Sequence, residues 1–145
     1  MKVVIPEDLL KQIHEHGQMA YPEEGAGLLF GLVDGDYKRV KAILELMNAR
    51  EAGARYNRYL ITPQDMLRGE NQADSLGLEI IGVFHSHPDH SNRPSEFDRD
   101  WAMPWYSYVI TSVDHGKAIE SRSWQLVADR SNFVEEEILS EKAAE

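Results

Sequence analysis

The stretch from Ile80 to Trp101, IIGVFHSHPDHSNRPSEFDRDW, carries the strongest information about the fold and the chemistry of this chain. It begins with a short apolar run that is typical of a buried strand, and His85 and His87 stand at the end of that run. Because alternate side chains of a strand point to the same face, the two imidazoles are predicted to lie side by side, with Cα atoms roughly 6–7 Å apart. Two imidazole nitrogens in that position can bind one metal ion at about 2.0–2.1 Å each.

A third metal ligand follows a short way downstream. Pro88 has no backbone N–H and is expected to end the strand. A polar loop then leads to Pro94-Ser95-Glu96-Phe97-Asp98, where Asp98 offers a carboxylate from the first turn of the next element. Two histidines and one carboxylate leave a tetrahedral zinc ion one open position, which is the arrangement of a catalytic zinc rather than a structural one.

The spacing of these residues resembles the signature of the JAMM (MPN+) zinc metallopeptidases in their stand-alone prokaryotic form. His85-Ser86-His87-Pro88 is followed by six residues, Ser95, two residues and Asp98, as in that signature. The resemblance implies that zinc is bound by His85, His87 and Asp98, and that Ser95 assists at the oxyanion.

A second part of the same signature lies far upstream. The segment Pro22-Glu23-Glu24-Gly25-Ala26-Gly27 matches the Pro-x-Glu-x-x-Gly pattern of the family, in which the glutamate handles the proton. The match selects Glu24 over Glu23, and neighbours on an extended segment face opposite ways, so only one of them can look into the site. The chain departs from the pattern at Ala26, where many bacterial members have cysteine, but no catalytic role attaches to that position.

The resemblance covers nearly the whole chain and implies one JAMM/MPN+ domain over residues 1–145. The implied fold is mixed α/β (α+β), with a curved central mixed β-sheet flanked by helices in the JAMM/MPN, cytidine-deaminase-like architecture. The implied activity is hydrolysis of a peptide or isopeptide bond after the C-terminal tail of a ubiquitin-like, sulfur-carrier protein, by Glu-assisted attack of zinc-bound water. The tail is expected to add to a sheet edge beside the zinc, with Tyr56, Tyr59 or Trp105 as candidate contacts.

Composition limits the partners and the location. Fifteen Lys+Arg against 25 Asp+Glu give a net charge of −10, which disfavours nucleic acid and anionic membranes because phosphate binding needs a basic face. The chain has no cysteine, so a disulfide framework and cysteine-bound zinc are excluded. No apolar run approaches the roughly 20 residues of a membrane span, and no signal peptide is evident, so a cytoplasmic location is expected.

Further elements follow from hydrophobic periodicity and from turn residues. A helix is predicted to start at Pro6 and to weaken near Gly17. Strands are predicted over residues 28–33, 37–47, 78–84, 106–111 and 118–127, helices over 62–76 and 95–103, and a strand or a short helix over 133–139. In strand 37–47, one face is assigned to Val40, Ala42, Leu44 and Leu46. The polar connection 48–57, near which Arg50, Arg55 and Arg58 give a local basic character, is interpreted as a solvated loop, and the tail 141–145 is expected to fray.

Several motifs also have a purely structural interpretation. Ser95-x-x-Asp98 is a capping box in its own right, and both functions can hold together. His14 and His16 lie about 200° apart on a helix, so they cannot share an ion and are interpreted as surface residues. His90 is expected to contact substrate or solvent, and His115 is placed in a hairpin turn without a role in the site.

Two other function classes remain open from the sequence. One is a non-catalytic MPN-type scaffold, which usually lacks the ligands that this chain carries. The other is a different zinc hydrolase, such as a deaminase or a DNA-repair-associated relative with a similar histidine pattern. The acidic charge argues against DNA as the substrate, and the chain has no cysteine pair for the zinc site of a nucleobase deaminase.

Overall fold

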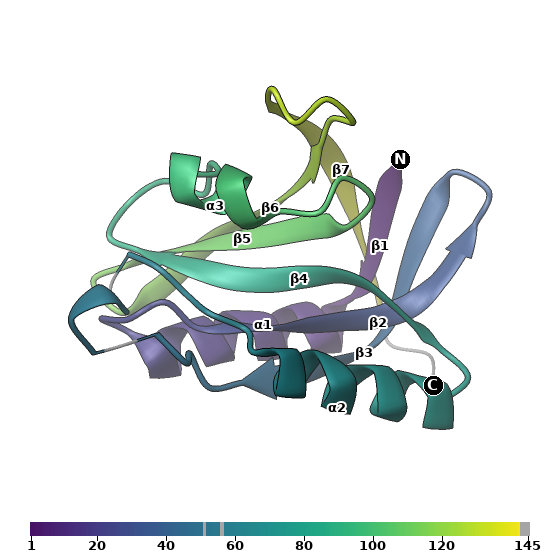
Figure 1. Cartoon of the computed structure of the whole chain (residues 1–145), viewed down its shortest axis with the longest axis horizontal. Helices are drawn as coiled ribbons and strands as arrows, with labels where there is room; N and C mark the ends of the chain where they lie inside the picture. Colours follow the sequence, from purple (N-terminus) through teal and green to yellow (C-terminus); the bar gives the residue numbers. More distant parts are fainter. Residues whose placement is uncertain (51, 56, 143–145) are drawn as a thin grey trace.

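The strands form a closed barrel with a long helix packed on either side of its wall. The computed structural model describes residues 1–50, 52–55 and 57–142. The elements in chain order are β1 (Lys2–Pro6), α1 (Glu7–Ala20), β2 (Ala26–Asp34), β3 (Tyr37–Leu46), the 3₁₀ turn η1 (Ala52–Ala54), α2 (Pro63–Ser75), β4 (Glu79–Pro88), α3 (Glu96–Trp101), β5 (Ser107–Asp114), β6 (Lys117–Leu126) and β7 (Phe133–Glu141). The strand order around the barrel is β1-β3-β2-β4-β5-β6-β7 (Figure 1). The predicted mixed α/β class, with a sheet flanked by helices, is confirmed.

The barrel closes through β1, a strand that the sequence did not predict. Strand β1 pairs in parallel with β3 and with β7, so it joins the two ends of the sheet. Its residues Val3, Val4 and Ile5 are all buried, and a strand covered on both faces shows no alternation of polar and apolar residues. The short apolar run therefore carries no strand periodicity, and it directly precedes the clearer signal of a helix start, which was predicted at Pro6.

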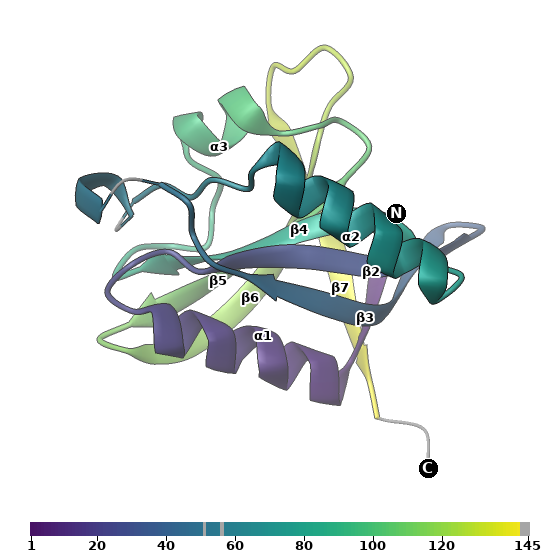
Figure 2. The ribbon, with the colours of Figure 1, turned by 60° about the horizontal axis from the view of Figure 1, so that its bottom comes forward.

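The two long helices cover different faces of the sheet, as the turned view shows (Figure 2). Helix α1 packs its Ile13 into one hydrophobic core. The other buried residues of this core are Val3, Ile5, Leu29, Val40, Ile81, Phe84 and Val109. Helix α2 packs its Ala73 into a second core, with Leu28, Phe30, Leu46, Ile80, Val83, Ala102, Tyr106, Tyr108 and Leu126. Adjacent residues of β2 and β4 thus contribute to opposite cores, as the two-residue period of a strand requires.

Helix α1 runs through Gly17 and ends at Ala20. A side chain at Gly17 would lie 3.1 Å from Cβ of Ser86 and 3.2 Å from a methyl group of Val113. Glycine therefore allows the helix to approach β4 and β5 closely, and this contact compensates for the low helix propensity of glycine.

The predicted common face of β3 is wrong at one residue. Val40 packs in the core with α1, whereas Ala42, Leu44 and Leu46 pack in the core with α2. The cause is a β-bulge, because Phe30 pairs with Ala42 while the next residue of β2 pairs with Val40. An extra residue on one strand reverses the alternation beyond it.

The remaining boundaries agree with the predictions within a few residues. Helix α2 begins with a capping box at Thr62, α3 ends two residues earlier than expected, and β7 is a strand rather than a helix. Strand β4 continues through the histidines to Pro88. The predicted fraying beyond residue 142 lies outside the described residues. None of the helices in the described part of the chain has the length and apolar character that crossing a bilayer requires.

Candidate metal centre

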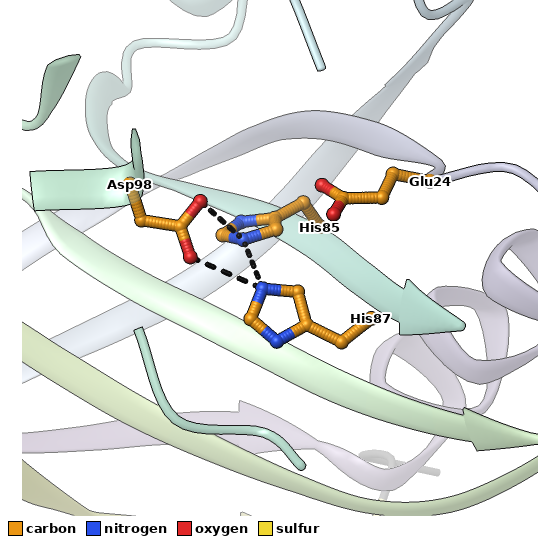
Figure 3. Close-up of side chains that lie close together, drawn as sticks. All are labelled: Glu24, His85, His87 and Asp98. Atoms are coloured by element: carbon orange, nitrogen blue, oxygen red, sulfur yellow. Dashed lines mark hydrogen bonds and ion pairs between the residues drawn. The ribbon is translucent and has the colours of Figure 1, made fainter. Parts of the chain in front are cut away.

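The two histidines come from the end of β4, in the middle of the sheet. His85 pairs with Ala26 of β2 on one side and with Ile110 of β5 on the other. Only 1% of the surface of His85 and of His87 is exposed. Their Nε2 atoms lie 3.2 Å apart, so the two rings face each other as the strand period predicts (Figure 3).

Asp98 reaches the histidines from the first turn of α3. Ser95 caps this helix through a capping box: the Ser95 hydroxyl accepts from the Asp98 amide at 3.0 Å, and Asp98 Oδ2 accepts from the Ser95 amide at 2.8 Å. The same carboxylate places Oδ1 3.3 Å from Nε2 of His85 and Oδ2 3.1 Å from Nε2 of His87. The cap therefore fixes the rotamer that brings the carboxylate to both imidazoles.

The donor atoms fit a single metal ion. Ligands at about 2.0–2.1 Å from a tetrahedral ion lie roughly 3.3–3.4 Å from one another. The two Nε2 atoms are 3.2 Å apart, and each has one oxygen of the Asp98 carboxylate at 3.1–3.3 Å, Oδ1 at His85 and Oδ2 at His87. The ring orientation also fits, because Nδ1 of His87 lies 2.7 Å from the carbonyl oxygen of Ser91. A hydrogen bond donated there leaves the lone pair of Nε2 directed at the cluster, as in many metal-binding histidines.

Charge in the cluster favours a cation. Burial alone would raise the pKa of Asp98, but the neighbouring charge of His85 and hydrogen bonds from both imidazoles outweigh it and hold that pKa well below its usual value. Asp98 is therefore ionised at neutral pH and available as a ligand.

Glu24 lies beside the cluster because β2 runs antiparallel to β4. Ala26 pairs with His85, so Glu24, two residues earlier in the chain, is level with the end of β4. The segment is pinned there by Ser86, whose hydroxyl accepts from the Gly25 amide at 2.8 Å and whose amide donates to the Gly25 carbonyl at 3.0 Å. At Gly27 any Cβ would overlap the ring of Phe84, which explains the last glycine of the upstream motif.

The side chain of Glu24 is buried and only weakly engaged. It is 2% exposed, and its Oε1 has no hydrogen-bond partner in the described part of the chain. Burial, opposed by the positive charge of His87, raises the pKa of Glu24 to about 8. One donor atom from each of Glu24, His85, His87 and Asp98 lies within 4.8 Å of the others, whereas Glu23 is not part of this group.

The sequence did not single out Asn48, which fastens the loop over the site. Its amide nitrogen donates to the carbonyl oxygens of Glu24 at 2.9 Å and Arg58 at 2.8 Å. Its Oδ1 accepts from the amides of Arg50 at 3.0 Å and Leu60 at 3.1 Å. Nothing in a single asparagine at the end of a predicted strand signals this role, which depends on segments brought together by folding.

Aromatic rings cover the two histidines. Tyr59 stacks on His85 with ring centroids 4.4 Å apart, and His90 stacks on His87 at 4.3 Å. The predicted contact Tyr59 is thus at the site, and His90 is an exposed loop residue beside it. Trp105 lines a different cavity, with Lys38 and Ile81. Tyr56 lies outside the described residues.

The interpretation of His14 and His16 as surface residues is wrong. Both are half-buried, with Nε2 of His14 2.8 Å from the Ser121 hydroxyl and Nε2 of His16 3.0 Å from the Ala26 carbonyl oxygen. They connect α1 to β6 and β2, because they lie at the edge of the helix face that packs on the barrel. His115 is exposed and sits in the β5–β6 turn with a φ of 50°, as predicted for a turn residue.

Comparison with known proteins gives a family and two named relatives. Residues 6–127 match the family model described as prokaryotic homologs of the JAB domain. A probable TtuB-protein conjugate cleaving protease of Thermus thermophilus is 28% identical over 127 residues, 86% of this chain and 79% of that protein. A desampylase of Haloferax volcanii is 34% identical over 95 residues, 64% of this chain and 65% of that protein, just under two thirds of its length.

The fold is shared along nearly the full length of the chain. The solution structure of a protein from Desulfitobacterium hafniense superposes with a TM-score of 0.86 at 28% identity. The match covers 99% of this chain and 95% of that one.

Proposed function

The chain belongs to the prokaryotic JAB-domain family, and from this premise we propose that it is a zinc metallopeptidase acting on ubiquitin-like proteins. It hydrolyses a peptide or isopeptide bond that follows the C-terminal tail of a sulfur-carrier-type protein. The names of the two relatives, a conjugate cleaving protease and a desampylase, support this activity. The observation that carries the proposal is the convergence of Glu24, His85, His87 and Asp98 from three separate segments.

In this proposal His85, His87 and Asp98 hold the zinc ion through two imidazole nitrogens and a carboxylate. Zinc accepts this donor set readily, and three protein ligands leave a position for the reaction. When bound, zinc supplies Lewis-acid chemistry: it polarises a carbonyl group and lowers the pKa of water from about 15.7 toward about 7.

Glu24 is the proton carrier. Its unpartnered Oε1 accepts a proton from the attacking water, and the carboxyl group later gives this proton to the leaving amine. Burial raises the pKa of Glu24, so its ionised form is a stronger base toward water than a solvated carboxylate is. Asn48 holds the backbone of Glu24 in place through its carbonyl oxygen.

Ser95 is the residue that we assign to the oxyanion. Its hydroxyl oxygen accepts from the Asp98 amide, which leaves the hydroxyl hydrogen free to be donated. A hydrogen bond to the developing negative charge stabilises a tetrahedral intermediate. The capping box keeps Ser95 one hydrogen bond away from the metal ligand Asp98.

The experiment measures metal content and cleavage on the same protein. Purified protein is assayed for zinc, then incubated with a ubiquitin-like protein that carries a short extension after its Gly-Gly end, and the products are read by intact mass. We expect about one zinc per chain, loss of the extension, and loss of activity on chelation that is reversed by added zinc. His87→Ala abolishes both zinc binding and cleavage.

The matched control is His115→Ala, which removes an exposed imidazole outside the centre and leaves zinc content and cleavage unchanged. Protein without stoichiometric zinc after reconstitution, or cleavage that persists in the chelated protein, would refute the proposal. Zinc-loaded protein that cleaves no extended or conjugated ubiquitin-like substrate would favour a scaffold instead.

A further inference from the structure

A small apolar cavity adjoins the metal centre. It has a volume of about 210 Å³ and shares Asp98 with the centre. Its walls are otherwise apolar or aromatic, formed chiefly by Tyr59, Met66, Phe97, Trp101 and Tyr108, apart from one charged residue, Arg50. Since an apolar cavity of ~150 Å³ holds a benzene molecule, this one has room for one large apolar side chain of a substrate.

Arg50 is held in a defined position at this cavity. Its guanidinium lies 4.8 Å from the ring centre of Phe97 and 5.7 Å from that of Trp101. Its backbone is fixed on both sides, since its amide donates to Asn48 Oδ1 at 3.0 Å and its carbonyl accepts from Arg55 Nε at 2.6 Å. Stacking on aromatic faces restricts the guanidinium plane without using its N–H groups.

One donor of Arg50 has no acceptor in the part of the chain that the structure describes. Its Nε is buried and has no hydrogen-bond partner among the described residues. A buried donor without a partner is costly, and a carboxylate is the acceptor that matches the planar fork of a guanidinium best. The arrangement therefore suits an anionic group that arrives with a ligand.

The loop that carries Arg50 is itself positively charged. Residues 48–60 contain Arg50, Arg55 and Arg58 but only one acidic residue, in a chain whose net charge is −10. The guanidinium of Arg58 lies 5.0 Å from the ring centre of Phe97, the ring that Arg50 also covers. This local reversal of charge attracts an anionic segment and repels a cationic one.

We infer that Arg50 and the cavity determine the specificity of the metal centre, by recognising a substrate segment in which a large apolar side chain lies next to a carboxylate. The carboxylate is an acidic side chain of the tail that precedes the Gly-Gly end. A tail with an arginine at the same place is disfavoured. This inference rests on the proposed peptidase function and narrows its substrate class.

The first test measures binding without cleavage. The ligands are fluorescently labelled peptides in which Gly-Gly is followed by a short extension. The two residues before the glycines are Leu-Glu, Leu-Gln or Leu-Arg. Each peptide is made with a free C-terminal carboxylate and with a C-terminal amide. Fluorescence anisotropy measures their binding to the zinc-free wild-type protein. The Leu-Glu peptide is expected to bind about tenfold more tightly than the Leu-Gln and Leu-Arg peptides. Arg50→Glu reverses the order, and Arg50→Gln abolishes it.

The pattern of loss identifies the source of the carboxylate. If an acidic side chain is recognised, the Glu-over-Arg preference depends on Arg50 while the acid and amide forms bind alike. If the acid-over-amide preference depends on Arg50 instead, the protein binds the terminal carboxylate of the extension, and the inference about the tail is overturned. Arg68→Glu is the matched control, because it makes the same change of charge at an exposed position of α2 and leaves both preferences intact.

The second test uses the zinc-loaded protein and a charge swap. A Leu-Arg tail is expected to be cleaved about tenfold faster, in kcat/KM, by Arg50→Glu than by the wild-type protein, a gain that a folding defect cannot produce. Equal preferences in wild-type and Arg50→Glu proteins would overturn the inference. If the protein cleaves the Leu-Glu and Leu-Arg tails equally well, this inference is refuted and the peptidase function stands. If the protein binds the two tails with different affinity but cleaves neither, the peptidase function is refuted and the inference about binding stands.

Discussion

Two buried polar clusters lie at different levels of the same barrel, and they are built in opposite ways. One is the metal centre. The other joins Lys38 of β3 to Glu136 of β7 through Ser107 of β5, with the Lys38 Nζ 2.9 Å from the Ser107 hydroxyl and that hydroxyl 2.8 Å from Glu136 Oε1. Ser107 pairs with Gly82, five residues before His87 on β4, or about 16 Å along the strand at roughly 3.3 Å per residue.

The clusters differ in how their charges are balanced. Lys38 and Glu136 carry opposite charges, and Lys38 Nζ also donates to the Trp105 carbonyl oxygen at 2.8 Å. Burial lowers the pKa of Lys38, and the charge of Glu136 opposes that shift. The metal centre instead joins two carboxylates to two imidazoles. In the first cluster a lysine and a carboxylate compensate each other, and removal of one partner leaves a buried charge unpaired. In the second cluster imidazole nitrogens and carboxylate oxygens lie together, which is a donor set suited to bind a cation.

The largest expected effect is on catalysis by Glu24→Gln. The substitution keeps the shape of the side chain and removes its ability to carry a proton, so kcat should fall about 10²–10⁴-fold while about one zinc per chain is retained. The measurement pairs cleavage kinetics with metal analysis. Glu23→Gln is the control, since Glu23 lies outside the four-residue group and its substitution should leave kcat unchanged. Full activity in zinc-loaded Glu24→Gln would overturn the assignment of Glu24.

The next effect is on stability at the other cluster. Lys38→Met leaves the buried carboxylate of Glu136 without its counter-charge and should lower the free energy of unfolding by about 3–5 kcal/mol, measured by urea denaturation. The double variant Lys38→Met/Glu136→Gln should recover most of this loss, because both charges are then gone. Zinc content should not change in either variant.

Lys41→Met is the control for the loss of charge, because Lys41 is exposed on the same strand and its substitution should cost little. If the single and double variants at Lys38 and Glu136 are equally unstable, the two residues do not balance each other. The proposed difference between the two clusters, that only the Lys38–Glu136 cluster balances its own charges, would then be wrong.

The smallest effect on stability is expected at Ser95. Ser95→Ala removes the cap of α3 and should cost about 1 kcal/mol, and it should also lower kcat by about 10²-fold if the hydroxyl serves the oxyanion. Ser95→Thr keeps both functions. Thr62→Ala removes the same kind of cap from α2. It should lower the free energy of unfolding by a similar amount and leave kcat unchanged. Equal effects of the two alanine variants on kcat would reduce Ser95 to a capping residue.

The amino-acid sequence alone predicted the ligands because their geometry is local. The period of a strand places His85 and His87 on one face, and a capping box fixes Asp98 at the start of a helix. It also predicted most strands and the start of α2. It did not predict β1 or the bulge in β3, since a short buried strand shows no alternation and a bulge depends on the register of the partner strand.

Only the tertiary structure decided what surrounds the ligands. The upstream motif pointed to Glu24 through the family resemblance, but the pairing of β2 with β4 shows how it reaches the histidines across 61 residues of sequence. Asn48 fastens the covering loop, and Arg50 contacts the rings of α3 beside the cavity. These contacts join segments that are distant in the chain, and no local period or spacing encodes them. The sequence therefore predicted the candidate ligands, whereas their environment, and with it the selectivity we infer, depends on the closure of the barrel.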